Sequence, residues 1–379
     1  MISVKLVFTS NYFNHHQKPF CDELYRRLGD DFAFIANAVM GEERKKLGYS
    51  QGDVPPYVHF AFLSQKGREE AKGLINDADV VIAGATPNDL LLERIRSGKL
   101  LFRYSERPFK IKPTLPKRVY HAYRFRKNNL WKRNIYMLCA SAYTAKDFAS
   151  LGMYHGRTYK WGYFPEVKEY DTASLMAKKK RNTLMWCGRF IDWKHPDDAI
   201  CVAQKLKAAG YDFHLNMVGT GVMQEYLYIL AEAMGVADRV SFTGSMPPEQ
   251  VRGYMEEAGI YLFTSDRQEG WGAVLNESMN SGCAVVASHA LGSAPFLIRD
   301  GQSGLIYESG NQDMLFEKVR YLLDHPEEQE RLGLEAYSTM QDTWNARVAA
   351  DRILRLSERI LAGERKPKLF EDGPGSTAR

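Results

Sequence analysis

Residues 259–288 read GIYLFTSDRQEGWGAVLNESMNSGCAVVAS, a strand pattern, a helix-length segment and a second strand pattern in succession. The runs GIYLFTS and AVVAS are rich in β-branched, aromatic and other apolar residues, which favours buried strands. Parallel strands need a long crossover connection, and the segment GWGAVLNESMNSG has the length of a crossover helix. The stretch therefore predicts an α/β domain with a parallel sheet.

The same alternation continues on both sides of this stretch. The strand patterns TLMWCGR, FHLNMVG and RVSFTG precede it, and VKLVFTS, DVVIAG, KLLFRYS and IYMLCAS form an earlier series. Between the two series, residues 164–182 are polar and rich in lysine, which favours a linker. We expect two doubly wound Rossmann-like domains, 1–165 and 166–363, facing across a cleft where their strands end. The last helix could return to the first domain, and the polar tail 364–379 is expected to be disordered.

Length and composition limit the class of protein. The 379 residues, 45% of them hydrophobic and 26% charged, suit a large globular chain and exclude a small disulfide scaffold. The charge-free stretch Ser278–Ile298 is interrupted by polar residues, glycine and proline, so it does not predict a membrane span. The start MISVKLVFTS lacks the features of a secretory signal. We expect a cytoplasmic protein.

The charge is distributed unevenly along the chain. Residues 1–160 carry 27 Lys and Arg against 15 Asp and Glu, whereas 161–379 carry 24 against 31. A basic half attracts anionic surfaces such as acidic lipid or nucleic acid, and an acidic half does not. The two halves are therefore expected to have different electrostatic roles.

Two glutamates flank a glycine-containing turn in the opening stretch. Glu269 follows the strand, and Glu277 lies eight residues later, about two helical turns along. Gly270 and Gly272 would let backbone N–H groups approach an anion closely at the start of a helix. A phosphate site is the functional interpretation. The alternative is that both glutamates are solvated surface residues.

Two further loops follow strands of the same domain. In WCGRFIDWKHPDDAI, Gly188 precedes Arg189 and Lys194, a pair of cations suited to a diphosphate. The loop GTG contains Gly219 and Gly221, which alone is a weak signal that also suits a tight turn. Surface cations in a polar loop are the alternative for the first. Together, the three loops predict one nucleotide-binding face.

The E-x7-E run from Glu269 to Glu277 and the G-R-x4-K run from Gly188 to Lys194 resemble those of family 4 glycosyltransferases, which are retaining enzymes of the GT-B architecture. The resemblance implies that Arg189 and Lys194 hold the donor diphosphate and act in catalysis, and that Glu277 bonds the donor ribose. It also implies that Glu269 acts in catalysis and contacts the donor sugar. The residues implied to contact the donor phosphates through their backbone amides are Gly270, Trp271, Gly272 and Ala273.

The first domain departs from that family. After the first strand, relatives often have a glycine-rich loop, but this chain has Asn14, His15, His16 and Gln17. These residues could contact the acceptor or a donor phosphate, or Asn14 could cap a helix that begins near His15. Where relatives often place a histidine near the reacting sugar, this chain offers Glu106 as a candidate catalytic residue. The alternative for Glu106 is a carboxylate paired with Arg103 or Arg107.

Residues 103–133 combine many cations with aromatic side chains and contain a single acidic residue, Glu106. Such a composition suits peripheral contact with an anionic membrane, where a lipid-linked acceptor would be met. Single-stranded nucleic acid is an alternative, but no nucleic-acid motif accompanies the stretch, and we expect no nucleic-acid partner. A solvated basic face is the third interpretation.

These features predict a retaining glycosyltransferase that moves a sugar from a nucleotide-diphosphate sugar to an acceptor hydroxyl in bacterial cell-surface polysaccharide or lipopolysaccharide synthesis. A UDP-sugar is favoured as donor and a GDP-sugar is possible, with no cofactor or metal required. A D-x-D sequence could bind a metal, but the one in this chain, Asp77 to Asp79, lies in the first domain, away from the predicted diphosphate site. The alternatives are a nucleotide-sugar epimerase of the same architecture and a non-catalytic basic module that binds membranes or nucleic acid.

Overall fold

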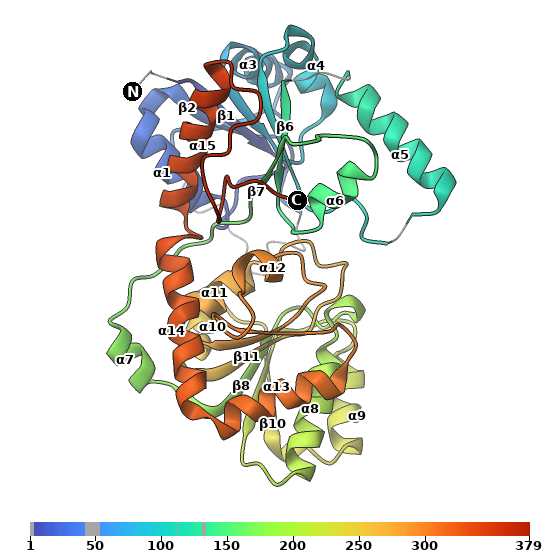
Figure 1. Cartoon of the computed structure of the whole chain (residues 1–379), viewed down its shortest axis with the longest axis vertical. Helices are drawn as coiled ribbons and strands as arrows, with labels where there is room; N and C mark the ends of the chain where they lie inside the picture. The colour runs from blue at the N-terminus through green and yellow to red at the C-terminus, as the bar shows by residue number, and fades with distance from the viewer. Residues whose placement is uncertain (1–3, 42–53, 112, 131–133) are drawn as a thin grey trace. The chain divides into compact units, whose positions relative to one another are not determined.

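A computed structural model describes residues 4–41, 54–111, 113–130 and 134–379. The chain forms two compact units (Figure 1). Unit 1 comprises Met1–Glu166 together with Asn345–Arg379, and unit 2 comprises Val167–Trp344. The division near residue 166 lies beside the boundary expected from the linker composition, and the C-terminal segment belongs to unit 1.

Unit 1 is built on a seven-stranded parallel sheet of order β3-β2-β1-β4-β5-β6-β7. Its strands are β1 (Leu6–Ser10), β2 (Phe32–Ala36), β3 (Val58–Phe60), β4 (Val80–Ala83), β5 (Leu100–Ser105), β6 (Ile135–Cys139) and β7 (Thr158–Lys160). The strand order reverses between β1 and β4. In doubly wound sheets, ligands bind beyond the carboxyl ends of the strands at such a reversal.

Five of the described helices of unit 1 lie between these strands in the chain, and a sixth, α15, returns from the C-terminal part of the chain. They are α1 (Lys18–Leu28), α3 (Gln65–Asp77), α4 (Asn88–Ser97), α5 (Leu115–Asn128), α6 (Thr144–Ala149) and α15 (Ala346–Leu361), with a 3-10 turn η1 (Gly29–Asp31) after α1. Helix α1 begins at Lys18, because the turn 15–17 precedes it; the expected start near His15 was too early. Helix α14 of unit 2 ends at Asp342, and α15, which belongs to unit 1, begins at Ala346.

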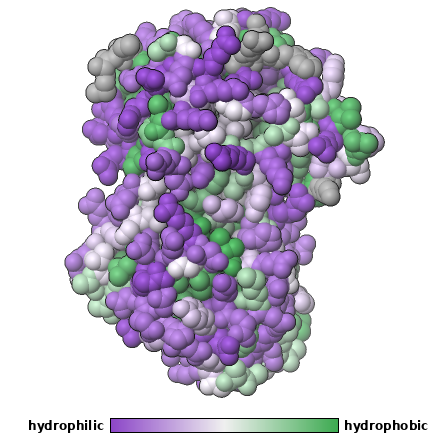
Figure 2. Space-filling view, in the orientation of Figure 1, coloured by the Kyte–Doolittle hydropathy of each residue, from purple (hydrophilic) through white to green (hydrophobic). Residues whose placement is uncertain are grey.

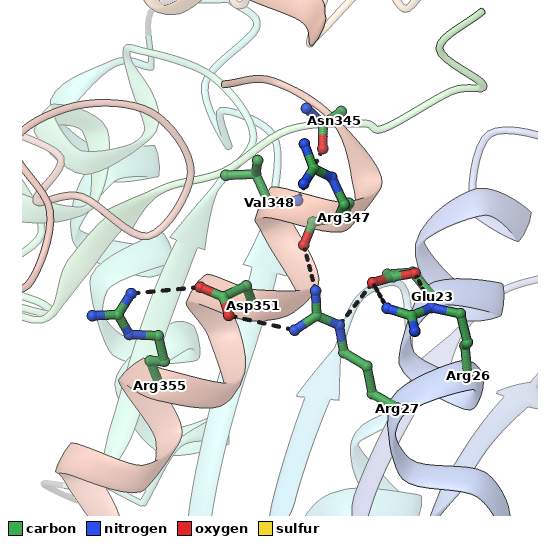
Figure 3. A network of polar contacts seen from close by, with 8 residues as sticks. All are labelled: Glu23, Arg26, Arg27, Asn345, Arg347, Val348, Asp351 and Arg355. Carbon is green, nitrogen blue, oxygen red and sulfur yellow. Dashed lines mark hydrogen bonds and ion pairs between the residues drawn. The ribbon is translucent and has the colours of Figure 1, made fainter. Parts of the chain in front are cut away.

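A polar network fastens α15 to α1 (Figure 3). Arg27 of α1 donates to the backbone oxygen of Arg347 at 3.2 Å and lies 3.4 Å from Asp351 of α15. Arg27 also contacts Glu23, whose pKa is lowered to about 2 by hydrogen bonds from Arg26 and Arg27. The last long helix is therefore an integral part of unit 1.

The C-terminal tail 364–379 differs from its expected disorder. Lys160 N donates to Ser376 O at 2.7 Å, and Ala378 N donates to Thr158 O at 2.9 Å, so the tail runs antiparallel beside β7 (Figure 1). Arg352 of α15 donates to the backbone oxygens of Asp372 and Pro374. The polar, glycine-containing composition suggested disorder, but a free sheet edge supplies the partners that the tail backbone needs.

Unit 2 contains a six-stranded parallel sheet of order β10-β9-β8-β11-β12-β13. Its strands are β8 (Lys180–Cys187), β9 (His214–Val218), β10 (Val240–Gly244), β11 (Ala258–Phe263), β12 (Ala284–Ser288) and β13 (Leu305–Tyr307). Here the order reverses between β8 and β11. The strands on either side of the reversal are those that precede the two candidate motifs.

The helices of unit 2 cover this sheet. They are α7 (Thr172–Ala177), α8 (Pro196–Ala208), α9 (Gln224–Ala233), α10 (Pro248–Glu257), α11 (Val274–Asn280), α12 (Ala294–Leu297), α13 (Gln312–Asp324) and α14 (Pro326–Asp342), with 3-10 turns η2 (Asp192–Lys194) and η3 (Ala237–Arg239). Leu184, Ile260 and Val286, on three neighbouring strands, are fully buried against α8 and α13 residues in one core. Both units are thus Rossmann-like α/β domains, as predicted. Within the described residues, no helix combines the length and apolar character needed to cross a membrane.

Candidate functional site

The strongest feature of unit 2 is an ion pair at the carboxyl edge of its sheet. Lys194 Nζ lies 2.5 Å from Glu269 Oε2, and both side chains are largely buried. Lys194 ends the turn η2 after β8, and Glu269 follows β11, so the pair spans the point where strand order reverses. The tertiary structure therefore joins the two motifs that sequence spacing had singled out separately.

A threonine fixes the backbone beneath this pair. Thr264, at the end of β11, donates from Oγ1 to the backbone oxygen of Lys194 at 2.6 Å and accepts from the Trp186 indole at 2.8 Å. All three residues are buried. Thr264 was not predicted from the sequence, although its position directly after an apolar strand pattern could have indicated a site residue.

Arg189 lies on the same loop as Lys194. Its guanidinium lies 5.9 Å from the centre of the Trp193 ring, and Trp193 O accepts from Asp266 N at 2.9 Å. His195, with a left-handed φ of 45°, places Nε2 3.5 Å from Asp266 Oδ2. The loops after β8 and β11 are therefore tied together at several points. Asp266 and His195 were not predicted.

Gly219 and Gly221 stand where backbones meet. A Cβ at Gly219 would lie 1.9 Å from Gly188 O, and the φ of Gly219 is 131°. A Cβ at Gly221 would lie 2.3 Å from Phe190 O, and Phe190 N donates to Thr220 O at 2.9 Å. These glycines are needed because the loop after β9 packs directly on the loop after β8.

The turn from Gly270 to Ala273 precedes α11 and contains a buried indole. The side chain of Trp271 is fully buried, donates to Asn276 Oδ1 at 2.9 Å and packs 5.9 Å from the Trp344 ring, so this indole serves the core of unit 2. Gly272 has φ 77°, and a Cβ there would lie 2.5 Å from the Phe263 ring. Only the backbone of this turn remains a candidate ligand contact.

Glu277 lies on α11 near the end of β8. Burial raises the pKa of its carboxyl, and the charge of Arg252 opposes that shift. The same carboxylate raises the pKa values of Cys187 and Tyr261, although burial is the larger cause for both. Glu277 is therefore a desolvated acid beside the carboxyl edge of the sheet.

In unit 1, the loop after β1 contains the predicted residues 14–17. Asn14 Oδ1 accepts from His16 N at 2.9 Å, and Asn14 O accepts from Gln17 N and Lys18 N at 3.0 Å. Asn14 thus shapes the turn before α1, whereas the residue at the helix cap is Gln17. The rings of His15 and His16 lie 3.9 Å apart between centres.

Glu106 contacts partners that were not anticipated. Tyr163, which follows β7, donates from its hydroxyl to Glu106 Oε1 at 2.7 Å, and Lys110 Nζ lies 3.3 Å from Oε2. Arg103 and Arg107 instead bond Asn129 and Asp147, so neither forms the alternative pair with Glu106. The Tyr163 ring also stacks at 6.5 Å on His16. Tyr163 therefore connects the two candidate loops of unit 1.

No cluster of three or more His, Cys, Asp or Glu side chains suited to a metal ion occurs among the residues that the structure describes. Asp79 of the D-x-D sequence accepts from Lys5 N at 2.9 Å.

These features define a class of fold. Two Rossmann-like domains with parallel sheets form the GT-B architecture, and the chain has this fold. Residues 167–339, nearly all of unit 2, match the family model "Glycosyl transferases group 1". The matched segment contains every candidate residue of the site in unit 2.

Particular proteins are similar to the chain. The "GDP-mannose-dependent alpha-(1-6)-phosphatidylinositol monomannoside mannosyltransferase" of Mycolicibacterium smegmatis is 27% identical over 194 residues, 50% of each chain. The "Lipopolysaccharide core biosynthesis glycosyltransferase LpsD" of Rhizobium meliloti is 28% identical over 190 residues, 50% of this chain and 53% of its own. The similarity thus spans about half the length of these curated relatives. The structure of Anabaena Alr3699/HepE in complex with UDP has a TM-score of 0.68 and 16% identity, covering 94% of this chain and all of that one.

Proposed function

We propose that the chain is a retaining glycosyltransferase of family 4 that moves a sugar from a nucleotide-diphosphate sugar to an acceptor hydroxyl. Unit 2 binds the donor and unit 1 binds the acceptor. The observation that carries the proposal is the Lys194–Glu269 pair, at 2.5 Å, beyond the strand ends where the order of the unit 2 sheet reverses. Ligands of open α/β sheets bind at such a reversal.

The chemistry of transfer suits these side chains. Breaking the bond between sugar and phosphate builds negative charge on the departing diphosphate while the anomeric carbon becomes cation-like. Lys194 and Arg189 stabilise the diphosphate, and Glu269 holds the Lys194 ammonium in place through their ion pair. With retention, a departing phosphate oxygen takes the acceptor proton on the same face, so no enzyme nucleophile and no metal is required.

The remaining donor contacts follow from the loops at the same sheet edge. The close approach of Gly219 to Gly188 excludes a side chain at Gly219, and the amides of both glycines are already bonded, to Gly244 O and Val218 O. Glu277 bonds the donor ribose, which restores hydrogen-bonding partners to a desolvated carboxyl. Backbone amides from Gly270 to Ala273 contact the sugar phosphate.

A UDP-sugar is the favoured donor, and a GDP-sugar is the second candidate. One similar structure is a complex with UDP, whereas one similar enzyme is GDP-mannose-dependent. The acceptor is a glycan or a lipid-linked glycan of the bacterial cell surface, which is consistent with similarity to a lipopolysaccharide core enzyme. Glu106, held by Tyr163, orients the acceptor hydroxyl together with the loop that contains His15 and His16.

Thermal-shift titration with UDP, GDP and ADP tests the donor site. A nucleotide at 100 times its dissociation constant stabilises the protein by about 2.7 kcal/mol. Arg189→Ala and Lys194→Ala are expected to remove the shift, whereas Lys205→Ala, which breaks a pair with Asp313 elsewhere in unit 2, keeps it. Equal shifts in all three variants would remove the diphosphate assignment.

Turnover separates transfer from the epimerase alternative. The protein is incubated with each candidate sugar nucleotide, with and without a membrane extract as the source of acceptor. Transfer predicts release of nucleoside diphosphate that depends on the extract. Interconversion of the sugar nucleotide without extract would instead identify an epimerase.

A further inference from the structure

Helix α5 presents an unusual surface in unit 1. None of its residues is buried. Leu115, Val119 and Tyr123, spaced four residues apart on one side, are 74%, 64% and 61% exposed. Figure 1 draws α5 apart from the sheet of unit 1, and Figure 2 shows apolar side chains gathered over it. Residues four apart lie on the same side of a helix, and an exposed apolar patch marks a site of contact with another molecule or a membrane.

Other side chains of α5 attach the helix to the protein. The Phe125 ring packs at 5.3 Å on Phe148, and Arg118 and Arg126 donate to the backbone oxygens of Ser150 and Gly152. These two arginines are therefore structural anchors. Their hydrogen bonds direct both guanidinium groups toward the loop after α6.

Three other cations border the exposed face. Lys117, Arg124 and Lys127 are exposed, and Lys127 Nζ lies 5.9 Å from the centre of the Tyr123 ring. Helix α5 contains no acidic residue. The face thus combines apolar side chains, tyrosines and positive charge, with no carboxylate on the helix to neutralise it. Lys112 and residues 131–133 of the basic stretch lie outside the described residues.

We propose that the exposed face of α5, formed by Leu115, Lys117, Val119, Tyr120, Tyr123, Arg124 and Lys127, docks in the interface of an anionic lipid bilayer. The apolar side chains enter the boundary between headgroups and acyl chains, the tyrosines lie at headgroup level, and the cations bind lipid phosphates. Charge complementarity selects this partner, because a neutral protein surface would leave three cations unused. This inference deepens the proposed function by naming the surface at which a lipid-linked acceptor is met.

Vesicle flotation tests the docking face. The full chain is mixed with vesicles of phosphatidylcholine alone or of phosphatidylcholine with phosphatidylglycerol. We expect binding only to the anionic vesicles, weakened by added salt because the headgroup contacts are screened. The variant Lys117→Gln/Arg124→Gln/Lys127→Gln is expected to bind roughly 100-fold more weakly, since each cation near an anionic surface contributes about a factor of five.

Two further variants separate the parts of the face. Leu115→Ser/Val119→Ser removes apolar area and is expected to weaken vesicle binding while leaving the salt dependence. Lys66→Gln/Lys178→Gln/Lys180→Gln removes the same charge from exposed positions elsewhere and is expected to bind vesicles like the parent chain. Equal losses in this control and in the α5 charge variant would overturn the proposal, as would absence of vesicle binding in the parent chain.

Vesicle binding can be tested separately from nucleotide binding at the candidate donor site. Each α5 variant is expected to keep the thermal shift produced by UDP or GDP, because α5 belongs to unit 1 and the candidate donor residues belong to unit 2. Loss of vesicle binding with an intact nucleotide shift supports the docking face. Binding of single-stranded oligothymidine in place of anionic vesicles would assign the face to nucleic acid and reject the bilayer.

Discussion

Lys194 and Glu269 are separated by 75 residues in the chain, and their side chains meet at 2.5 Å in a largely buried ion pair. The pair is formed because β8 and β11 are neighbours in the sheet, so the loops that follow them leave from the same edge. Removal of one partner from a desolvated ion pair leaves the charge of the other buried and uncompensated, which is destabilising. It gives the sharpest test of the candidate site.

Removal of the ammonium from this pair is expected to affect both stability and activity. Lys194→Ala leaves the Glu269 carboxylate without its partner, which we expect to lower the free energy of unfolding by about 1–3 kcal/mol. It is also expected to lower turnover by about 100-fold or more, as for other groups that stabilise developing charge. Urea denaturation and nucleoside diphosphate release measure the two effects. A double-mutant cycle with Glu269→Gln that shows no coupling would contradict the pair.

The close backbone approach at Gly219 predicts a steric effect. Gly219→Ala is expected to destabilise unit 2 and weaken nucleotide binding, because a Cβ would overlap Gly188 O at 1.9 Å and the backbone would be strained. Gly253→Ala is the control: a Cβ there meets nothing within 4 Å, and alanine stabilises a helix by about 0.5–1 kcal/mol relative to glycine. Thermal melts with and without UDP compare the variants. A harmless Gly219→Ala would contradict the packed loop.

The raised pKa of Glu277 predicts a pH dependence of stability. Its folded state holds the proton more tightly than the unfolded state, so the folded state binds more protons in the window above the ordinary value of 4.5. The stability that protonated Glu277 allows is therefore present below 4.5 and is lost as pH rises through its raised pKa. At low pH, Glu277→Gln is expected to have the same free energy of unfolding as the parent chain. At neutral pH without nucleotide, it is expected to be more stable than the parent chain. Urea midpoints across pH measure this difference, and identical pH profiles would contradict it.

The hydrogen bond between Tyr163 and Glu106 predicts a defect confined to the acceptor. Tyr163→Phe keeps the ring on His16 but removes the 2.7 Å bond to Glu106. We expect about 10-fold lower acceptor-dependent turnover for Tyr163→Phe, which loses one hydrogen bond. For Glu106→Gln we expect about 100-fold, at the lower end of the range for positioned acid or base groups. The thermal shift with nucleotide is expected to be unchanged in both. A lost nucleotide shift would assign Glu106 to the donor instead.

Deletion of residues 364–379 is expected to destabilise unit 1. The deletion removes the backbone bonds of Ser376 and Ala378 to β7 and exposes the edge of that strand. Free strand edges favour association between chains, so we expect a lower melting temperature and concentration-dependent aggregation. Light scattering during a thermal melt measures both. Substitution of Lys368 by glutamine, at an exposed position in the tail, is the control that should leave both unchanged.

Much of the fold followed from local patterns. Apolar runs such as those of β11 and β12 predict buried parallel strands because both faces of such a sheet are covered. The tail escaped prediction because its composition describes a chain without partners, whereas the free edge of β7 provides them. The family resemblance implied a backbone contact at Trp271, and only the structure shows that its indole packs in the core of unit 2.

The sequence predicted which charged residues belong to the candidate site, but not the contacts that they make with one another. Lys194, Arg189 and Glu269 were predicted because cations and glycine-containing turns after apolar strands suit a phosphate, and because their spacing resembles motifs of a known family. It did not identify Thr264, His195 or Tyr163, whose contacts come from segments far apart in the chain. For α5, composition indicated a basic aromatic surface. Only the structure shows that Arg118 and Arg126 form hydrogen bonds to backbone oxygens of unit 1. Lys117 and Arg124 are exposed.

Periodicity and residue type along the chain were enough to define two α/β domains and to place cations beyond the strands of the second. Both signals are local, since a strand or a helix reveals itself within ten or fifteen residues. The pairing of Lys194 with Glu269, the attachment of the tail to β7 and the orientation of each α5 side chain depend on strand order and on packing between distant segments. Such contacts form only when the chain folds, so no local pattern contains them.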